Sequence, residues 1–113
     1  MIHQLKCWPE FYEAISDGRK TFEIRKNDRG FHTDDVLVLE EWDPFTEQYS
    51  GRVTRVRIVW MMFAEETDVS GLLPDHVAMS IRLAHQVEAI QQRETAEVIT
   101  SSIYSEIPGG VLA

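Results

Sequence analysis

The sequence predicts an α+β fold, in which a small mixed β-barrel with one early helix is followed by a C-terminal helical or loose segment. Three observations support this prediction. The chain has 113 residues, which is enough for one hydrophobic core. About five short stretches have the apolar or alternating pattern of β-strands. One short amphipathic stretch near the start has helical spacing, and this combination suits a small barrel.

The first strand and the helix are predicted from the opening of the chain. Residues 2–7 suit a short strand, and residues 10–17 suit a helix. Phe11 and Ile15 are four residues apart and are expected to share the buried face of this helix. Gly18 is placed to end it in a left-handed conformation.

Four further strands complete the predicted barrel, at residues 21–25, 36–42, 52–63 and 76–83. The second and third of these form a hairpin across a loop of about eight to ten residues. Strict alternation along the long strand places five side chains on one face: Thr54, Val56, Ile58, Trp60 and Met62. The three tryptophans, Trp8, Trp42 and Trp60, are interpreted as core residues. Trp8, just before the helix, would cover the mouth of the barrel and could touch a ligand there.

The chain divides at the end of the last strand. Residues 1–83 are predicted to form the barrel domain, and residues 84–113 a helical or flexible appendage. Residues 85–99 fit a helix with a thin apolar stripe. The last residues contain Pro108, Gly109 and Gly110 and are expected to be loosely held.

Composition limits the possible functions. A net charge of −8 argues against a protein that coats nucleic acid indiscriminately. The single cysteine, Cys7, excludes an internal disulfide, indicates a reducing compartment and is expected to be a buried small hydrophobe. No apolar run approaches the length of a membrane span, and the start lacks a signal-peptide layout. We therefore expect a cytoplasmic protein without a membrane partner.

Residues 18–29 stand out by their charge. They contain five of the eleven basic residues and two acids, so they carry +3 while the rest of the chain carries −11. A cationic island on an anionic protein suits selective binding of a nucleotide or of one RNA feature. Arg25 could grip a phosphate or a base edge, and Glu23 could accept from an amino group. Alternatively, Glu23 and Arg25 pair with charges on a neighbouring strand, and Arg19 and Lys20 are solvated.

Two other groups of polar residues have simpler interpretations. Arg52, Arg55 and Arg57 form a second basic patch, and Glu40 and Glu41 lie on the partner strand, so cross-strand pairing is expected. The histidines show no metal-ligand spacing, with each other or with Cys7, and we expect neither a metal nor a cofactor.

The basic segment also resembles a known signature. Gly18 to Arg25, after a short helix begun by Trp8-Pro9, resembles the G-x-K-x-x-E-x-R motif of ASCH domains in the PUA-like superfamily. With Asp35-Val36-Leu37 and Glu41-Trp42-Asp43-Pro44, it is similar to a phage and bacterial branch described as domain-of-unknown-function family 3850. The resemblance covers about residues 3 to 82.

The resemblance implies a PUA-like barrel whose signature residues line a cleft between the early helix and the sheet. It also implies RNA or a modified nucleotide as the ligand, because the superfamily mostly handles these. The residues expected to bind that ligand are Gly18, Arg19, Lys20, Thr21, Glu23, Arg25, Lys26, Arg29 and Phe31. For Phe31 the alternative is that it only plugs the end of the barrel.

Two other functions remain open. Some small ASCH proteins are amidohydrolases that act on acetylcytidine, and Lys20 would match their catalytic lysine. Their nucleophilic threonine falls at Glu23, which cannot replace that hydroxyl, and Glu65 and Glu66 are only candidates for their glutamate. A different chemistry, with Glu23 as base beside Lys20, is the other way in which the chain could be an enzyme. Enzyme activity is therefore uncertain, and binding is preferred. The third possibility is a phage-type adaptor that meets a protein partner through its acidic surface or residues 84–113.

Overall fold

The computed structural model describes residues 1–64 and 71–85. It contains five strands and one helix in the predicted order: β1 (Ile2–Cys7), α1 (Pro9–Ser16), β2 (Phe22–Lys26), β3 (Val36–Asp43), β4 (Gln48–Phe63) and β5 (His76–Leu83). The α+β class is thus confirmed, although β4 begins four residues before the predicted start at residue 52. The hairpin turn is correspondingly shorter than expected.

The predicted appendage lies almost entirely outside the described residues. This holds for the helix expected at residues 85–99 and for the loose end after it. Glu65 and Glu66 are also outside them. Within residues 1–64 and 71–85, no helix is long and apolar enough to cross a membrane.

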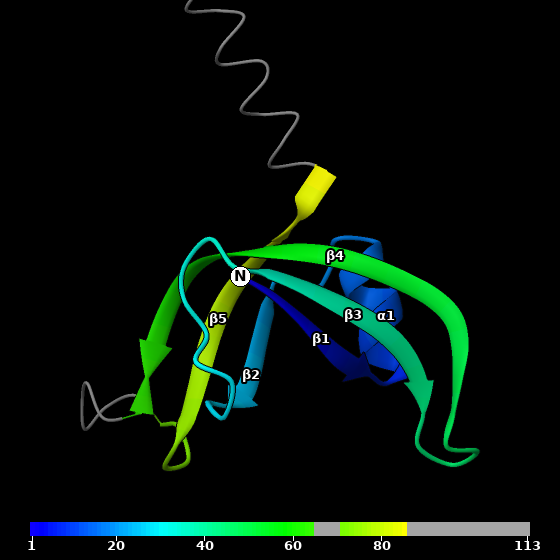
Figure 1. The fold of residues 1–113 in the computed structure, drawn as a ribbon, viewed down its shortest axis with the longest axis horizontal. Helices are drawn as coiled ribbons and strands as arrows, with labels where there is room; N and C mark the ends of the chain where they lie inside the picture. The colour runs from blue at the N-terminus through cyan, green and yellow to red at the C-terminus, as the bar shows by residue number, and fades with distance from the viewer. Residues whose placement is uncertain (65–70, 86–113) are drawn as a thin grey trace, which may run out of the picture.

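The strands form a single sheet in the order β1-β3-β4-β5-β2. β1 runs parallel to β3, and the other neighbours are antiparallel. The sheet curls strongly into a half-barrel, which gives the arch seen in Figure 1. Because β1 and β2 are the two edge strands, this curl brings the first and last strands of the sheet toward each other.

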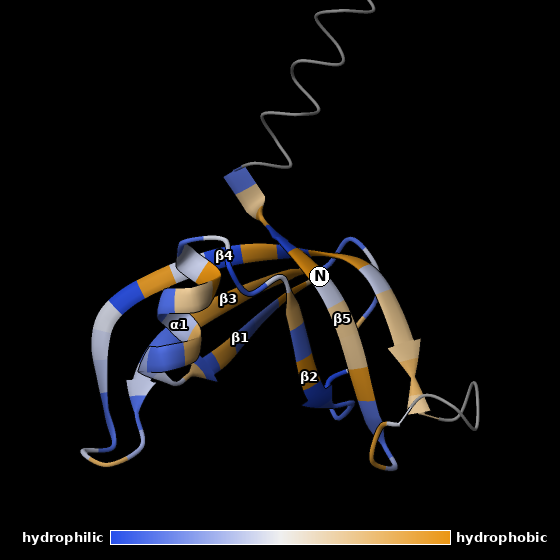
Figure 2. Ribbon diagram, turned by 180° about the vertical axis from the view of Figure 1, so that it is seen from behind, coloured by the Kyte–Doolittle hydropathy of each residue, from blue (hydrophilic) through white to orange (hydrophobic). Residues whose placement is uncertain are grey.

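The core fills the inner side of the half-barrel. Alternate residues of β1, β3, β4 and β5 point into it, as the burial pattern of each strand shows. In β5, for example, Val77, Met79 and Ile81 are almost fully buried. Helix α1 adds Tyr12 and Ile15 to the same cluster, so it covers the inner face of the sheet. Figure 2 shows α1 lying across β3 and β1.

The buried face of α1 differs from the prediction. Tyr12 and Ile15, three residues apart, are buried, whereas Phe11 is exposed. Both i, i+3 and i, i+4 pairs share a helix face, so spacing alone could not choose between Phe11 and Tyr12. Phe11 instead stacks on Trp8, with their ring centroids 6.3 Å apart. Trp8 is itself half-exposed, and its assignment to the core was wrong.

A β-bulge in β4 overturns the predicted face of the long strand. The pairing with β5 shifts register between Ile58 and Trp60, which leaves Val59 as the extra residue. Before the bulge Val56 and Ile58 point inward, and after it Met61 and Phe63 pack against the core. Trp60 therefore points outward and is 63% exposed, so its assignment to the core was wrong.

Arg52 joins the helix to the β3–β4 hairpin. Its guanidinium donates to both carboxylate oxygens of buried Glu41, at 3.0 and 2.7 Å, and also pairs with Glu13 of α1. It lies 4.8 Å from the ring centroid of Tyr12. Hydrogen bonds from Arg52 and then from Ser50 hold the pKa of Glu41 below its ordinary value. The predicted cross-strand pairing is thus confirmed for Arg52 and Glu41.

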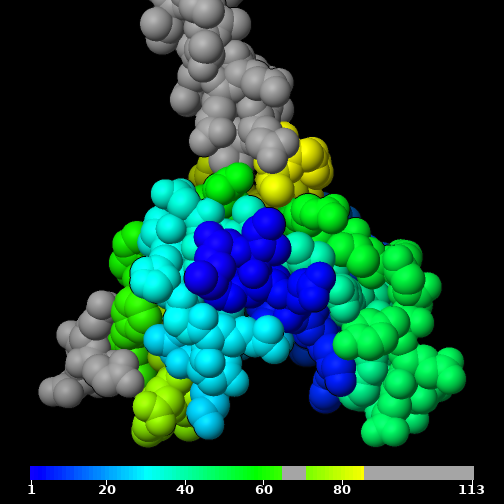
Figure 3. All heavy atoms as spheres, in the orientation of Figure 1, coloured from blue at the N-terminus to red at the C-terminus, as the bar shows by residue number. Residues whose placement is uncertain are grey.

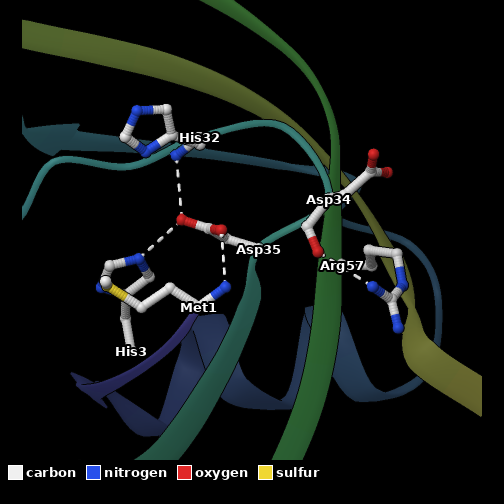
Figure 4. Close-up of polar contacts among 6 residues, drawn as sticks. All are labelled: Met1, His3, His32, Asp34, Asp35 and Arg57. Atoms are coloured by element: carbon white, nitrogen blue, oxygen red, sulfur yellow. Dashed lines mark hydrogen bonds and ion pairs between the residues drawn. The ribbon is translucent and has the colours of Figure 1, made fainter.

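A second polar cluster surrounds the buried carboxylate of Asp35 (Figure 4). Its oxygens contact His3 Nε2 at 2.8 Å, the Met1 amino group at 3.0 Å and the backbone N–H of His32 at 3.0 Å. Burial alone would raise the pKa of Asp35, but these hydrogen bonds outweigh it and lower that pKa to about 2. The cluster therefore ties the start of β1 to the start of β3.

Candidate functional site

The two edge strands meet along a seam that side chains close. Arg25 of β2 donates from Nη2 to the carbonyl oxygen of Lys6 in β1, at 2.7 Å. Arg29, in the loop after β2, donates from Nη1 to the carbonyl oxygen of Gln4, at 2.9 Å. Gln4 and Lys6 are two residues apart, so both carbonyls point from the same edge of β1. The seam is thus joined by two guanidinium groups rather than by a backbone ladder.

A pocket of about 400 Å³ lies at this seam. Its lining comes from the end of β1, the start of α1 and the strand β2: Lys6, Cys7, Trp8, Phe11, Lys20, Phe22, Glu23, Ile24 and Arg25. Figure 3 shows the surface hollowed between β1, in dark blue, and the light-blue segment that includes the loop after β2. A volume of this size suits a small organic ligand.

Three charged side chains meet in the pocket. The Glu23 carboxylate is buried, and it accepts from Lys20 Nζ at 2.6 Å and from Arg25 Nε at 2.8 Å. Lys20 Nζ also donates to the carbonyl oxygen of Phe22, at 2.7 Å. A buried carboxylate needs such partners, because an unpaired charge is costly to desolvate. The group as a whole carries +1 and favours an anionic or electron-rich ligand.

The same group keeps donors to spare. An ammonium has three N–H groups and a guanidinium five, and the contacts above use two of each. The remaining N–H groups of Lys20 and Arg25 are therefore available to a ligand. Glu23 fixes both cations in place, which lowers the entropic cost of presenting those donors.

Aromatic rings form the walls around the cations. Lys20 Nζ lies 4.7 Å from the ring centroid of Phe22 and 5.6 Å from that of Phe11. Trp8, Phe11 and Phe22 are all partly exposed, so part of each ring is accessible to a ligand. The pocket thus combines a charged floor with flat apolar walls.

The end of α1 positions Lys20. Gly18 has a φ of +84°, a left-handed conformation that favours glycine, and its N–H bonds the carbonyl oxygen of Ile15. The chain then turns so that the Lys20 N–H bonds the carbonyl oxygen of Ala14, at 2.9 Å. Lys20 is therefore anchored through its backbone before its side chain reaches Glu23.

Cys7 lines the pocket as a thiol. Burial, followed by the negative charge of Glu23, raises its pKa to about 11 despite the opposing charges of Arg25 and Lys20. At neutral pH the sulfur is protonated and is a poor nucleophile. The expected role of Cys7 as a buried small side chain is confirmed.

Three of the predicted ligand residues, Lys20, Glu23 and Arg25, come together in the pocket. The others lie elsewhere. Arg19 pairs with Asp17, and Arg29 bridges the seam to Gln4. Phe31 is buried in the core, with its ring 4.8 Å from that of His3. The pocket lining also excludes Gly18, Thr21 and Lys26.

Sequence reasoning missed most of the pocket walls. Phe22 and Ile24 alternate with charged residues, but here the charged residue Glu23 is buried and the apolar pair is exposed. Alternation reveals two faces without saying which one is inside. Trp8, which was expected to be able to touch a ligand, does line the pocket, whereas Phe11 and Lys6 were not expected there and reach it only because the sheet curls. No local pattern in the sequence signals that contact.

The described residues hold no group of three or more His, Cys, Asp or Glu side chains that could bind a metal ion.

Comparison with known proteins places the chain in a family. Residues 2–81 match the model of a domain of unknown function, DUF3850. A similar protein is the uncharacterised 12.9 kDa protein in the GpA 3′ region of Escherichia phage P2, which is 32% identical over 78 residues. That alignment covers 69% of this chain and 65% of the phage protein. The matched segment contains the whole pocket, and the chain belongs to the DUF3850 family.

Proposed function

We propose that this chain is a PUA-like domain of the ASCH type, and that it binds RNA or a modified nucleotide in the seam pocket. The observation that carries the proposal is the convergence of Lys20, Glu23 and Arg25 on one pocket beside α1. The signature resemblance implies a cleft between the early helix and the sheet, and the pocket lies between α1 and the two edge strands.

The chemistry of the pocket supports a nucleotide. Its lining has three cations, Lys6, Lys20 and Arg25, against the one carboxylate of Glu23. This net charge of +2 and the spare N–H donors suit a phosphate or a base carbonyl. Its partly exposed rings, Trp8, Phe11 and Phe22, suit a base, which binds by stacking on aromatic side chains. The negative charge of the rest of the chain repels bulk polyanion, so this local site favours selective binding.

The pocket favours binding over amide hydrolysis. An acyl transfer of the amidohydrolase type needs a hydroxyl nucleophile, and the described lining contains neither Ser nor Thr. Thr21 lies outside this lining, and the Cys7 sulfur is protonated at neutral pH. Lys20 is bound to a carboxylate and to a carbonyl, which suits a positioned donor.

A calorimetric titration tests the proposal. The wild type and Lys20→Met are titrated with nucleoside monophosphates, cytidine, acetylcytidine and short RNA oligonucleotides. Methionine keeps an apolar stem beside Phe22 but removes the charge and the donors. We expect saturable binding by the wild type and a loss of at least tenfold in Lys20→Met, because a charge-assisted hydrogen bond contributes about 1.5–3 kcal/mol.

Arg19→Gln is the matched control. It makes the same change of charge one residue away, at a guanidinium held by Asp17 outside the pocket. We expect its affinity to equal that of the wild type. If no ligand binds to folded wild-type protein, or if both variants lose affinity equally, the pocket is not the site. Turnover of acetylcytidine that stops in Lys20→Met would instead favour the amidohydrolase.

A further inference from the structure

The outer face of the sheet across β2, β5 and β4 exposes aromatic and apolar side chains. The register aligns Phe22, Ser80 and Trp60 in one row and Ile24, Ala78 and Met62 in the next. All six point away from the core, because their neighbours along each strand point into it. We call this surface the β2–β5–β4 face.

The exposure of this face is unusual for a sheet. Trp60 is 63% exposed, Phe22 52% and Ile24 51%. Scattered exposed apolar residues are ordinary, but here they are neighbours on adjacent strands. The bulge at Val59 is what turns Trp60 outward into the same row as Phe22. Two aromatic rings are therefore presented on one surface.

The same face is strongly cationic. Its border carries Arg55, Arg57, Arg82 and Lys26, and no outward position of these strand segments holds a carboxylate. None of the four makes an ion pair with a carboxylate of the described residues. The chain has nineteen acids, so this exclusion of carboxylates is a marked asymmetry.

Arg57 and Arg82 are direct cross-strand partners. Like charges in this position destabilise a sheet, and the usual remedy is a nearby carboxylate. Arg57 donates from Nη1 to the carbonyl oxygen of Asp34, at 2.9 Å (Figure 4). Among residues 1–64 and 71–85, its buried Nε has no hydrogen-bond partner. Two guanidinium groups therefore lie side by side without a carboxylate partner in the described part of the chain, which favours an anionic ligand.

We propose that the β2–β5–β4 face binds single-stranded nucleic acid. Bases stack on Trp60 and Phe22, and the phosphates between them contact Arg57, Arg82 and their basic neighbours. A duplex hides the faces of its bases, so the rings select single strands. Phe22 and Ile24 belong to both this face and the pocket, so a strand lying on the face can continue into the pocket. The face does not require the pocket to bind.

Fluorescence anisotropy with labelled twelve-nucleotide strands tests this inference, using rU12, dT12 and a twelve-base-pair duplex. We expect both single strands to bind and the duplex to bind much more weakly. Trp60→Ser should weaken single-strand binding about tenfold, since one stacked base contributes about 1–3 kcal/mol. Phe45→Ser is the matched control, because Phe45 is 95% exposed in the β3–β4 turn, away from this face.

The salt dependence tests the arginines. Replacing both Arg55 and Arg82 with Gln should lower the slope of log K against log salt by about 1.4, two contacts at about 0.7 each for a single strand. Arg82→Lys keeps the charge and should keep the slope. If the double variant loses affinity equally for rU12 and dT12, the ribose 2′-hydroxyl is not required. If it loses affinity for rU12 alone, the ligand is RNA.

Two outcomes would overturn the inference. One is the absence of strand binding: neither single strand binds the wild type, or Trp60→Ser binds the single strands as tightly as Phe45→Ser does. The other is that Trp60→Ser converts a dimer into a monomer in sedimentation while strand binding is unchanged, which would make the face a self-association surface. If only the proposed pocket function is wrong, the result is different. Lys20→Met then leaves mononucleotide affinity unchanged, whereas Trp60→Ser still weakens binding of the twelve-nucleotide strands.

Discussion

The Arg25 guanidinium donates to the Lys6 carbonyl oxygen at 2.7 Å while its Nε donates to Glu23 at 2.8 Å. One side chain therefore closes the seam between β2 and β1 and also fixes the carboxylate on the pocket floor. The geometry of the pocket and the closure of the half-barrel are coupled through Arg25. A ligand that draws on the free N–H groups of Arg25 also acts on the joint between the two edge strands.

The two seam arginines should differ in their effects. Arg25→Met removes one of the two cationic partners of buried Glu23, so we expect the free energy of unfolding to fall by about 2 kcal/mol. Arg29→Met removes only a surface bond to Gln4 and should cost about 1 kcal/mol or less. Urea unfolding measures both. Nucleotide affinity should fall in Arg25→Met alone. An equal fall in Arg29→Met would mean that Arg29 also binds the ligand.

The contact between Arg52 and Glu41 should behave as a coupled pair. Arg52→Met leaves the buried Glu41 carboxylate without its bidentate partner, so we expect a lower urea midpoint. Adding Glu41→Gln removes the unpaired buried charge and should restore part of the urea midpoint. A double-mutant cycle measures the coupling. If the two effects simply add, the pair does not act as a unit.

Asp35 should make the fold sensitive to acid. Its pKa is about 2 in the folded protein, below the ordinary 3.8, so the carboxylate stabilises the fold above about pH 4. That contribution, about 2 kcal/mol, is lost as the pH falls toward 2. Urea unfolding of wild type and Asp35→Asn at several pH values checks this. The difference between them should shrink below pH 4, and a constant difference would contradict the assignment.

Cys7 should resist alkylation in the folded protein. A pKa near 11 leaves about a hundredfold less thiolate at pH 7.5 than an ordinary thiol has, and the sulfur is also buried. Mass spectrometry after iodoacetamide treatment should show unmodified protein in buffer and full modification in urea. Rapid modification of the folded chain would mean that the thiol is activated and that the pocket has a nucleophile after all.

Much of the fold could be predicted from local pattern. The strands, the early helix and its end at Gly18 follow from periodicity and turn chemistry, which are local properties. Lys20, Glu23 and Arg25 could be chosen as a group because they occupy the three charged positions of the G-x-K-x-x-E-x-R signature that the segment resembles. The aromatic walls could not be predicted as a group, since Phe11 and Phe22 line one pocket only through the curl of the sheet. Phe31 was ambiguous because a loop aromatic carries no periodic signal of burial.

The bulge at Val59 changes which alternate residues of β4 face outward. Odd-numbered residues face outward before it and even-numbered residues face outward after it. The two ends of β4 can therefore carry surfaces of different character on one continuous strand, arginines at one end and aromatic or thioether side chains at the other. Deleting Val59 would remove the bulge and leave Trp60 and Met62 facing outward by ordinary alternation. Regular pairing that kept Val59 would instead exchange the inward and outward faces of every residue that follows it in the strand.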